Sequence, residues 1–297
     1  MIHLFALLSL LLCGVCYTGF QNSSHFHNTS NRRSLLLLVF GGALLLRLLL
    51  AYTTHGFSND IACFAAWADR IFTLGPGQFY SAEMFTDYPP GFMYVLYLIG
   101  ALRSLLQIPY YSDLHILLLK LPAILCDIAC GFLLYREAVK RLHFSDLQGI
   151  FAASAHLFQP ADILNSSCWG QVDSVYTLMI ILMCLFLMKG NLLPAYAVYG
   201  LGVLLKPQML IFTPVLLAGI WDHVFLQDFS WRKFFYNLCG GLVVICGMLL
   251  LCAPFGLTAA ISQYTSTLGS YEYAAINAYN FCCLLYTSPS PRDVEES

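Results

Sequence analysis

Long apolar runs recur along this chain, and they constrain its fold more than any other feature. Hydrophobic residues make up 59% of its 297 residues and charged residues only 10%, with a mean hydropathy of +0.71. A water-soluble domain carries about 25% charged residues, so this chain has too little polar surface to cover itself in water. Crossing a bilayer core takes about 20 apolar residues, and backbone polar groups inside it need internal partners. We therefore expect an all-α, polytopic integral membrane protein with about eight transmembrane helices.

The expected helices coincide with the apolar segments. The first segment lacks the basic start of a signal peptide, which favours a helix over a cleaved leader. The net charge of -2 and the absence of a basic block give no indication of nucleic-acid binding. The segments are residues 4–20, 35–52, 92–106, 114–135, 149–164, 175–188, 192–205, 209–221 and 235–252.

The Lys and Arg residues of the short loops predict the orientation, because such loops favour the cytoplasm. If the three basic loops are cytoplasmic, residues 53–88, the WGQVD motif and the turn after residue 205 all lie outside. This outer loop and the second basic loop would lie on opposite sides of the membrane, so the chain crosses it an odd number of times between them. Two apolar segments are present there, and only one of them can cross fully. We therefore expect residues 92–106 to be re-entrant or interfacial. The basic loops contain Arg32 and Arg33; Arg136, Lys140 and Arg141; and Arg232 and Lys233.

The first polar motif, SNDIACFAAWADRI, follows the first long apolar run. Asp60, Phe64, Trp67 and Ile71 share one face if this segment is helical. That pattern predicts an amphipathic helix on the membrane surface with a carboxylate at its start. Ser, Asn and Asp also suit helix caps, so N-capping is the alternative role for Asp60.

The motif FTDYPPGFMYVL precedes the next apolar segment. Pro89, Pro90 and Gly91 predict a rigid turn that starts a helix, since proline fixes its own backbone angle. Tyr88 suits a membrane interface.

Two further motifs lie directly before later apolar runs. In NSSCWGQVDSVYTL, Trp169 suits an interfacial belt, but packing does not explain Gln171 and Asp173. In LLKPQML, Lys206 and Gln208 stand between two apolar runs; the lysine either snorkels to the interface or holds a phosphate. Together the four motifs place carboxylates, amides, aromatic rings and a cation on one face. This mixture suits a phosphorylated lipid and a sugar, with a carboxylate as base and a cation near the leaving phosphate.

The order of these motifs resembles the GT-C superfamily of membrane glycosyltransferases. It is closest to bacterial proteins related to mannosyltransferase II of the GPI-anchor pathway. The resemblance extends over about residues 35–281, and its most specific part is the pair WGQVDS and LLKPQ. The residues that carry it are Asp60 with AAWADRI, Tyr88-Pro89-Pro90-Gly91, Leu121-Pro122 with Asp127, Asn165-Ser166, Trp169 to Ser174, and Lys206-Pro207-Gln208.

This resemblance implies inverting transfer of a hexose, expected to be mannose, from a polyprenyl-phosphate sugar to a glycan or lipid acceptor. It implies a bacterial plasma-membrane protein with its active site on the outer face and Asp60 as catalytic carboxylate. The family often has a second acidic residue beside that carboxylate, where this chain has Asn59. The need for a divalent metal therefore stays open, and no other cofactor is expected. The expected substrate-binding residues are Tyr88, Trp169, Gln171, Asp173, Lys206 and Gln208.

Two other functions stay open. A transporter or flippase of a lipid-linked glycan should carry polar groups near the membrane midplane, often in repeated halves, and we find no internal repeat. A structural subunit without chemistry would leave the clustering of polar motifs unexplained. For Asp127, within an apolar run, we expect a buried helix–helix hydrogen bond, with a lipid-phosphate contact as the alternative.

The last residues have a different character from the rest of the chain. CLLYTSPSPRD resembles a translation of the transposase adapter used in sequencing libraries. We expect the authentic sequence to stop near Phe281, as a C-terminally truncated domain whose natural chain continues with further spans. Long-read sequencing of the locus tests this hypothesis. We thus expect an N-terminal helix and linker (1–33), a transmembrane domain (34–281) and a non-native tail (282–297).

Overall fold

The computed structural model describes Gly14 and residues 32–80, 85–227 and 229–269. Every regular element in these residues is helical, and no strand occurs among them, which confirms the all-α prediction. The expected helix at 4–20 and the adapter-like tail at 282–297 lie outside the described residues.

Within the described residues, four helical stretches are long and apolar enough to cross a bilayer. Two are the single helices α2 (Arg32–Thr53) and α5 (Asp113–Lys140). The third, Pro207–Leu226, contains α10 (Thr213–Trp221), and the fourth, Trp231–Phe255, contains α11 (Trp231–Cys252).

The remaining apolar helices are shorter. Helices α8 (Asp173–Met188) and α9 (Leu192–Leu205) have 16 and 14 residues. At about 1.5 Å per residue they span roughly 24 and 21 Å, less than a bilayer core of about 30 Å. The segment expected at 149–164 divides into α6 (Asp146–Leu157) and α7 (Pro160–Ile163), because Pro160 cannot continue the hydrogen bonding of a helix. The helical, membrane-compatible fold is thus confirmed, whereas a total of about eight transmembrane helices is not.

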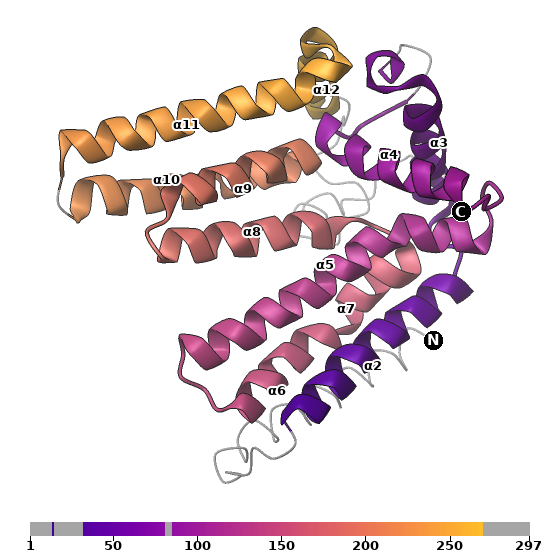
Figure 1. Cartoon of the computed structure of the whole chain (residues 1–297), viewed down its shortest axis with the longest axis horizontal. Helices are drawn as coiled ribbons and strands as arrows, with labels where there is room; N and C mark the ends of the chain where they lie inside the picture. Colours follow the sequence, from indigo (N-terminus) through magenta and orange to yellow (C-terminus); the bar gives the residue numbers. More distant parts are fainter. Residues whose placement is uncertain (1–13, 15–31, 81–84, 228, 270–297) are drawn as a thin grey trace, which may run out of the picture.

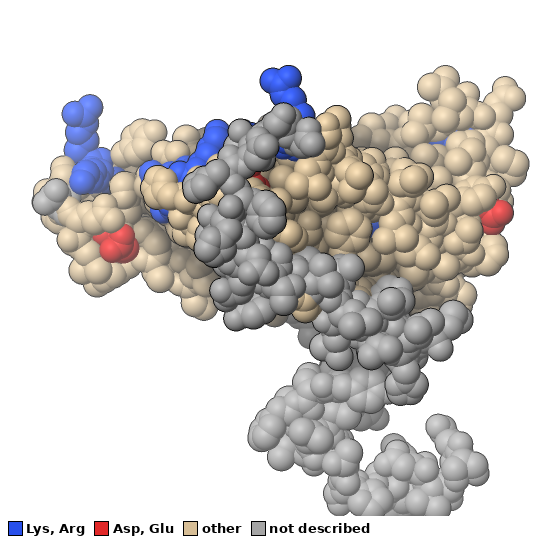
Figure 2. Space-filling model, turned by 90° about the horizontal axis from the view of Figure 1, so that it is seen from below, with Lys and Arg blue, Asp and Glu red and all other residues tan. Residues whose placement is uncertain are grey.

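The long helices lie side by side in a flat array. Figure 1 shows them in the order α11, α9 with α10, α8, α5, α6 with α7, and α2, and each neighbouring pair is in contact. The basic loops gather at one end, on the left of Figure 1, where α2 and α11 begin and α5 ends. Figure 2 shows that most of the Lys and Arg side chains visible from below lie toward that end. We call it the basic end.

Two helices cover the opposite end of the array. Figure 1 shows α3 (Ser58–Leu74) running across the long helices, with α4 (Pro90–Leu105) packed against it. Helix α4 starts at the end of α9 and leads away toward the start of α5, instead of running beside α9. This placement favours the interpretation that residues 92–106 are interfacial.

Glycines allow α4 to approach its neighbours closely. A Cβ atom on Gly91 would lie 2.5 Å from the Leu204 carbonyl oxygen, and one on Gly100 would lie 2.5 Å from that of Ala68. The Pro89-Pro90-Gly91 sequence therefore starts α4, as predicted, and also permits its contact with α9.

The predicted shared face of α3 is confirmed, but it packs into the protein core with residues of α4 and α5, where Phe64, Trp67 and Ile71 are each at most 2% exposed. Asp127 is confirmed in its expected role of a buried interhelical contact. Its carboxylate binds Arg47 of α2 at 3.2 Å and accepts a hydrogen bond from the Ser166 hydroxyl at 2.6 Å.

Candidate functional site

The WGQVD motif forms a tight loop before α8. A π-helical turn, Leu164–Trp169, ends at Gly170, whose φ of 90° suits glycine. The backbone N–H groups of Gly170 and Gln171 both donate to the Asn165 carbonyl, each at 3.0 Å. A Cβ on Gly170 would lie 2.6 Å from the side chain of Ile61, so this loop packs directly against α3.

Asp60 receives two hydrogen bonds from this loop. The indole N–H of Trp169 donates to Asp60 Oδ2 at 2.9 Å, and the Gln171 amide donates to the same oxygen. The N-cap of α3 is Phe57, without a side-chain capping bond, and Asp60 is the third residue of the helix. The capping alternative for Asp60 is therefore wrong, because its carboxylate binds the WGQVD loop instead.

Lys206 occupies the turn between α9 and Pro207, and its side chain is largely buried. Its ammonium group donates to Asp173 Oδ1 and lies 5.6 Å from the ring centres of both Tyr88 and Tyr176. Asn165 donates to the second oxygen of Asp173 at 3.0 Å. The cation is thus held by a carboxylate and by two aromatic faces.

Asp60 and Lys206 line one cavity of about 520 Å³. This volume lies within the usual range for small-molecule sites, about 300–1,000 Å³. Five of the seven predicted site residues line it, and the other two bind its walls: Trp169 holds Asp60 and Asp173 holds Lys206. The lining residues are Asp60, Cys63, Phe64, Trp67, Phe85, Asp87, Tyr88, Gln171, Lys206, Pro207, Gln208, Leu210 and Ile211.

A second carboxylate, Asp87, lines the same cavity and was not among the predicted site residues. Burial raises the pKa of the Cys63 thiol, and the charges of Asp87 and Asp60 raise it further. Both carboxylates are therefore close enough to act on one cavity group. The position of Asp87 directly before Tyr88 was the only signal in the sequence.

The donor set does not favour a resident metal. Among the described residues, no group of three or more His, Cys, Asp or Glu side chains is arranged to hold a metal ion. Within the described part of the chain the two cavity carboxylates have no such third partner, and we derive no chemical step through a metal.

Lys120 is a second functional candidate that the sequence reasoning missed, because it lies within an apolar run of α5. Its fully buried ammonium group donates to the carbonyls of Ala51, Thr54 and Ser167 at 2.7–3.2 Å, and to the Thr54 hydroxyl. These bonds tie the end of α2 to the π-helical turn. Lys120 therefore supports the loop that orients Asp60.

The arrangement combines an oriented carboxylate, an ammonium group and aromatic walls around a space for a small ligand. A carboxylate of this kind can accept a proton from a hydroxyl, and an ammonium group can bind an anion.

No protein-family model and no curated protein matches this sequence.

Proposed function

We propose that this protein is a GT-C-type membrane glycosyltransferase that moves a hexose, with mannose as first candidate, from a polyprenyl-phosphate sugar to a glycan or lipid acceptor. The observation that carries the proposal is the shared cavity of Asp60 and Lys206. A base for the acceptor and a cation for the donor phosphate have to face the same space, and these two residues do.

The reaction needs one proton acceptor and one anion site. The acceptor hydroxyl oxygen attacks the anomeric carbon from the face opposite the phosphate. The new glycosidic C–O bond forms as the bond to the phosphate oxygen breaks, which inverts the anomeric centre. Asp60 takes the hydroxyl proton, and polyprenyl phosphate leaves with the electron pair of the broken bond.

The hydrogen bonds at Asp60 support its role as base. Trp169 and Gln171 both donate to Oδ2, which leaves Oδ1 to accept the hydroxyl proton. The side chain thus needs little reorganisation before the reaction.

Lys206 stabilises the leaving phosphate in this proposal. Asp173, which binds the ammonium group, does not line the cavity; we therefore assign it to holding Lys206 and no longer to direct substrate contact. Tyr88, Gln171 and Gln208 line the cavity and contact donor or acceptor. Trp169 positions Asp60.

The location of the site supports the expected sidedness. Helices α3 and α4 cover the end of the array opposite the basic end. If the basic end faces the cytoplasm, as Lys- and Arg-rich loops do, the cavity opens at the outer face.

The alternative, a flippase of a lipid-linked glycan, needs polar groups along a path through the membrane. Arg47 with Asp127, the most buried ion pair among the described residues, lies within the array but lines none of the cavities described here. This observation favours the enzyme.

Transfer of radiolabelled hexose from a synthetic polyprenyl-phosphate donor to lipid-extract acceptors, by the purified full chain, tests the proposal. We expect Asp60→Asn to slow transfer about 100- to 10,000-fold, the usual contribution of a general base. Asp69→Asn is the matched control, since Asp69 is on the same helix but pairs with Arg103.

Two results would contradict the proposal. The first is an equal transfer rate in wild type and Asp60→Asn. The second is movement of a fluorescent lipid-linked glycan across vesicles without formation of a glycoside, which would support the flippase.

A further inference from the structure

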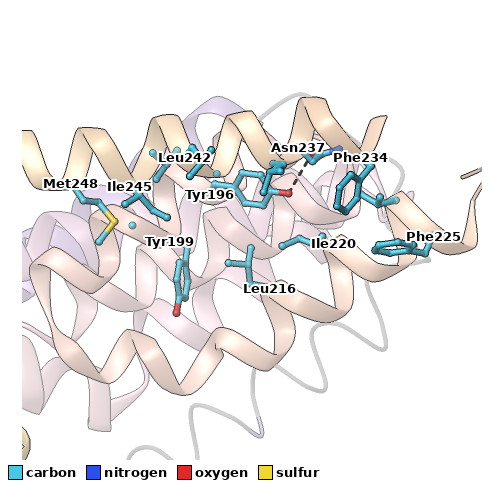
Figure 3. Close-up of a pocket in the computed structure, with 15 residues that line it drawn as sticks. Tyr196, Tyr199, Leu216, Ile220, Phe225, Phe234, Asn237, Leu242, Ile245 and Met248 are labelled. Carbon is cyan, nitrogen blue, oxygen red and sulfur yellow. Dashed lines mark hydrogen bonds between the residues drawn. The ribbon is translucent and has the colours of Figure 1, made fainter. Parts of the chain in front are cut away.

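A second, apolar cavity of about 400 Å³ runs along α11, from Phe234 near the basic end to Met248. Figure 3 shows its lining side chains between α9, α10 with the following turn, and α11. The surface that these side chains turn toward the cavity is almost entirely apolar. Two polar groups among them pair with each other, because the hydroxyl of Tyr196 donates to Asn237 Oδ1 at 3.4 Å. Helix α11, which forms one wall, exposes most of its apolar surface. In a bilayer this cavity would be bordered by hydrocarbon.

A polar hollow adjoins this cavity. It also measures about 400 Å³ and contains Arg232, Lys233 and His223. Asn237 lines both spaces, and its amide donates to the Lys233 carbonyl at 2.8 Å. A space with two cationic side chains thus borders an apolar one, with Asn237 in the wall that both share.

Aromatic side chains cluster at the turn before α11 and at its first residues, next to Arg232 and Lys233 in the sequence. Trp221 and Phe225 lie 4.7 Å apart between ring centres, Phe229 and Trp231 lie 5.2 Å apart, and Phe234 packs on Trp231. Tryptophan-rich belts of this kind sit at the head-group level of membranes. The basic hollow is therefore at the level where a lipid phosphate would lie.

We propose that these two spaces form a binding site for an anionic phospholipid. The phosphate lies between Arg232 and Lys233, and one acyl chain enters the apolar cavity along α11. Charge complementarity selects an anionic over a zwitterionic lipid, because basic pockets between membrane helices bind anionic head groups. This site shares no lining residue with the cavity of Asp60, so it does not depend on the proposed glycosyl transfer.

Lipid retention measured by native mass spectrometry tests the head-group half of the site. The purified full chain is released from nanodiscs that contain equal amounts of phosphatidylglycerol and phosphatidylcholine. We expect wild type to retain mainly phosphatidylglycerol, and the double substitution Arg232→Gln with Lys233→Gln to lower that preference by on the order of tenfold. Arg32→Gln with Arg33→Gln is the matched control, because these cations lie at the same end but outside the hollow.

A second pair of variants tests the apolar cavity, which would hold the acyl chain of the lipid. A Cβ atom on Gly241, which lines the apolar cavity, meets nothing within 4 Å, and the same holds for Gly247, which does not line it. Gly241→Leu should therefore fill the cavity without a backbone clash and reduce phosphatidylglycerol retention, whereas Gly247→Leu should not.

Three outcomes would overturn the site. Equal retention of the two lipids by wild type would remove the charge argument. Unchanged phosphatidylglycerol retention in Gly241→Leu would show that the acyl chain does not occupy the apolar cavity. In nanodiscs that also contain polyprenyl phosphate, its retention in place of phosphatidylglycerol, abolished by the same substitutions, would replace the phospholipid with another occupant.

Discussion

Two of the charged clusters in the described part of this protein use similar groups in opposite ways. Arg47 and Asp127 bind each other at 3.2 Å within the array, and Arg47 also donates to the Leu157 carbonyl at 2.6 Å. Asp60 and Lys206 have separate hydrogen-bonding partners and share a cavity instead. The first cluster turns its charges toward protein, and the second turns them toward a space that a ligand can enter.

This difference shows that an ionisable residue in an apolar chain is not by itself a sign of function. Asp127 is 2% exposed, and its contacts include an Arg and a Ser hydroxyl. Such a pair mainly specifies how helices pack. The neighbouring cavity, more than the charge, separates the candidate site from the structural cluster.

The largest effect on stability should come from breaking the structural cluster. Asp127→Ala leaves a buried Arg47 without its counter-charge, which costs about 3–5 kcal/mol. Asp60→Asn keeps a hydrogen-bond acceptor on a partly exposed side chain and should change the free energy of unfolding much less. Thermal unfolding of the purified protein in detergent measures both.

A double substitution sharpens this contrast. Arg47→Met with Asp127→Leu removes both charges and should recover most of the lost stability, since apolar residues often replace a buried ion pair without loss. Equal destabilisation by Asp60→Asn and Asp127→Ala would instead mean that the two clusters have the same structural role.

Lys206→Gln should weaken donor binding and leave the fold largely intact. A hydrogen bond to a charged group contributes about 1.5–3 kcal/mol, so KM for the polyprenyl-phosphate sugar should rise roughly 10- to 100-fold. The exposed Lys140 provides the control variant Lys140→Gln. If both substitutions changed only the expression level, the phosphate role of Lys206 would fail.

The sequence predicted the helical class and brought the main site residues into one hypothesis. These predictions were possible because long apolar runs indicate helices. Polar motifs at the same ends of several such helices indicate one common face of the membrane protein. Gln171 and Lys206 are far apart in sequence, yet both lie where a helix meets the same end of the array.

Other features depend on packing between helices, which periodicity does not describe. Helical periodicity predicts which residues of α3 share a face, but not which loop binds the Asp60 carboxylate. The alternative that Asp60 caps the helix could therefore not be rejected from the sequence. The role of Lys120 depends on carbonyls of Ala51, Thr54 and Ser167, which come together only in the folded chain.

Gly170→Ala should reduce turnover more than stability. Alanine at a φ of 90° is strained by about 1–2 kcal/mol, and its methyl group would also displace Ile61 or the loop that carries Trp169 and Gln171. Gly75→Ala is strained at least as much, because φ 76° with ψ 170° is a conformation that essentially only glycine adopts, but its Cβ meets no atom within 4 Å. Steady-state transfer rates and melting temperatures of both variants separate strain from the displacement of Asp60's donors. Equal rates in the two would exclude the positioning role.

The smallest expected effect concerns Cys63, which reports the charge of the cavity without any substrate. Burial and then the negative charges of Asp87 and Asp60 raise the pKa of its thiol. Less reactive thiolate is therefore present at pH 8 than for an ordinary cysteine, and alkylation should be slow. Asp87→Asn removes one charge, lowers the pKa and should speed alkylation a few-fold.

Peptide-resolved mass spectrometry after N-ethylmaleimide treatment, at several pH values, measures this rate at Cys63. The exposed Cys239 is the internal standard, since it lines none of the cavities described here. Asp127 is not among the groups that raise the pKa of the Cys63 thiol, so Asp127→Asn should leave the Cys63 rate unchanged. An equal acceleration by Asp87→Asn and Asp127→Asn would mean that substitution loosens the fold, and that the two carboxylates of the cavity do not act on Cys63 through their charge.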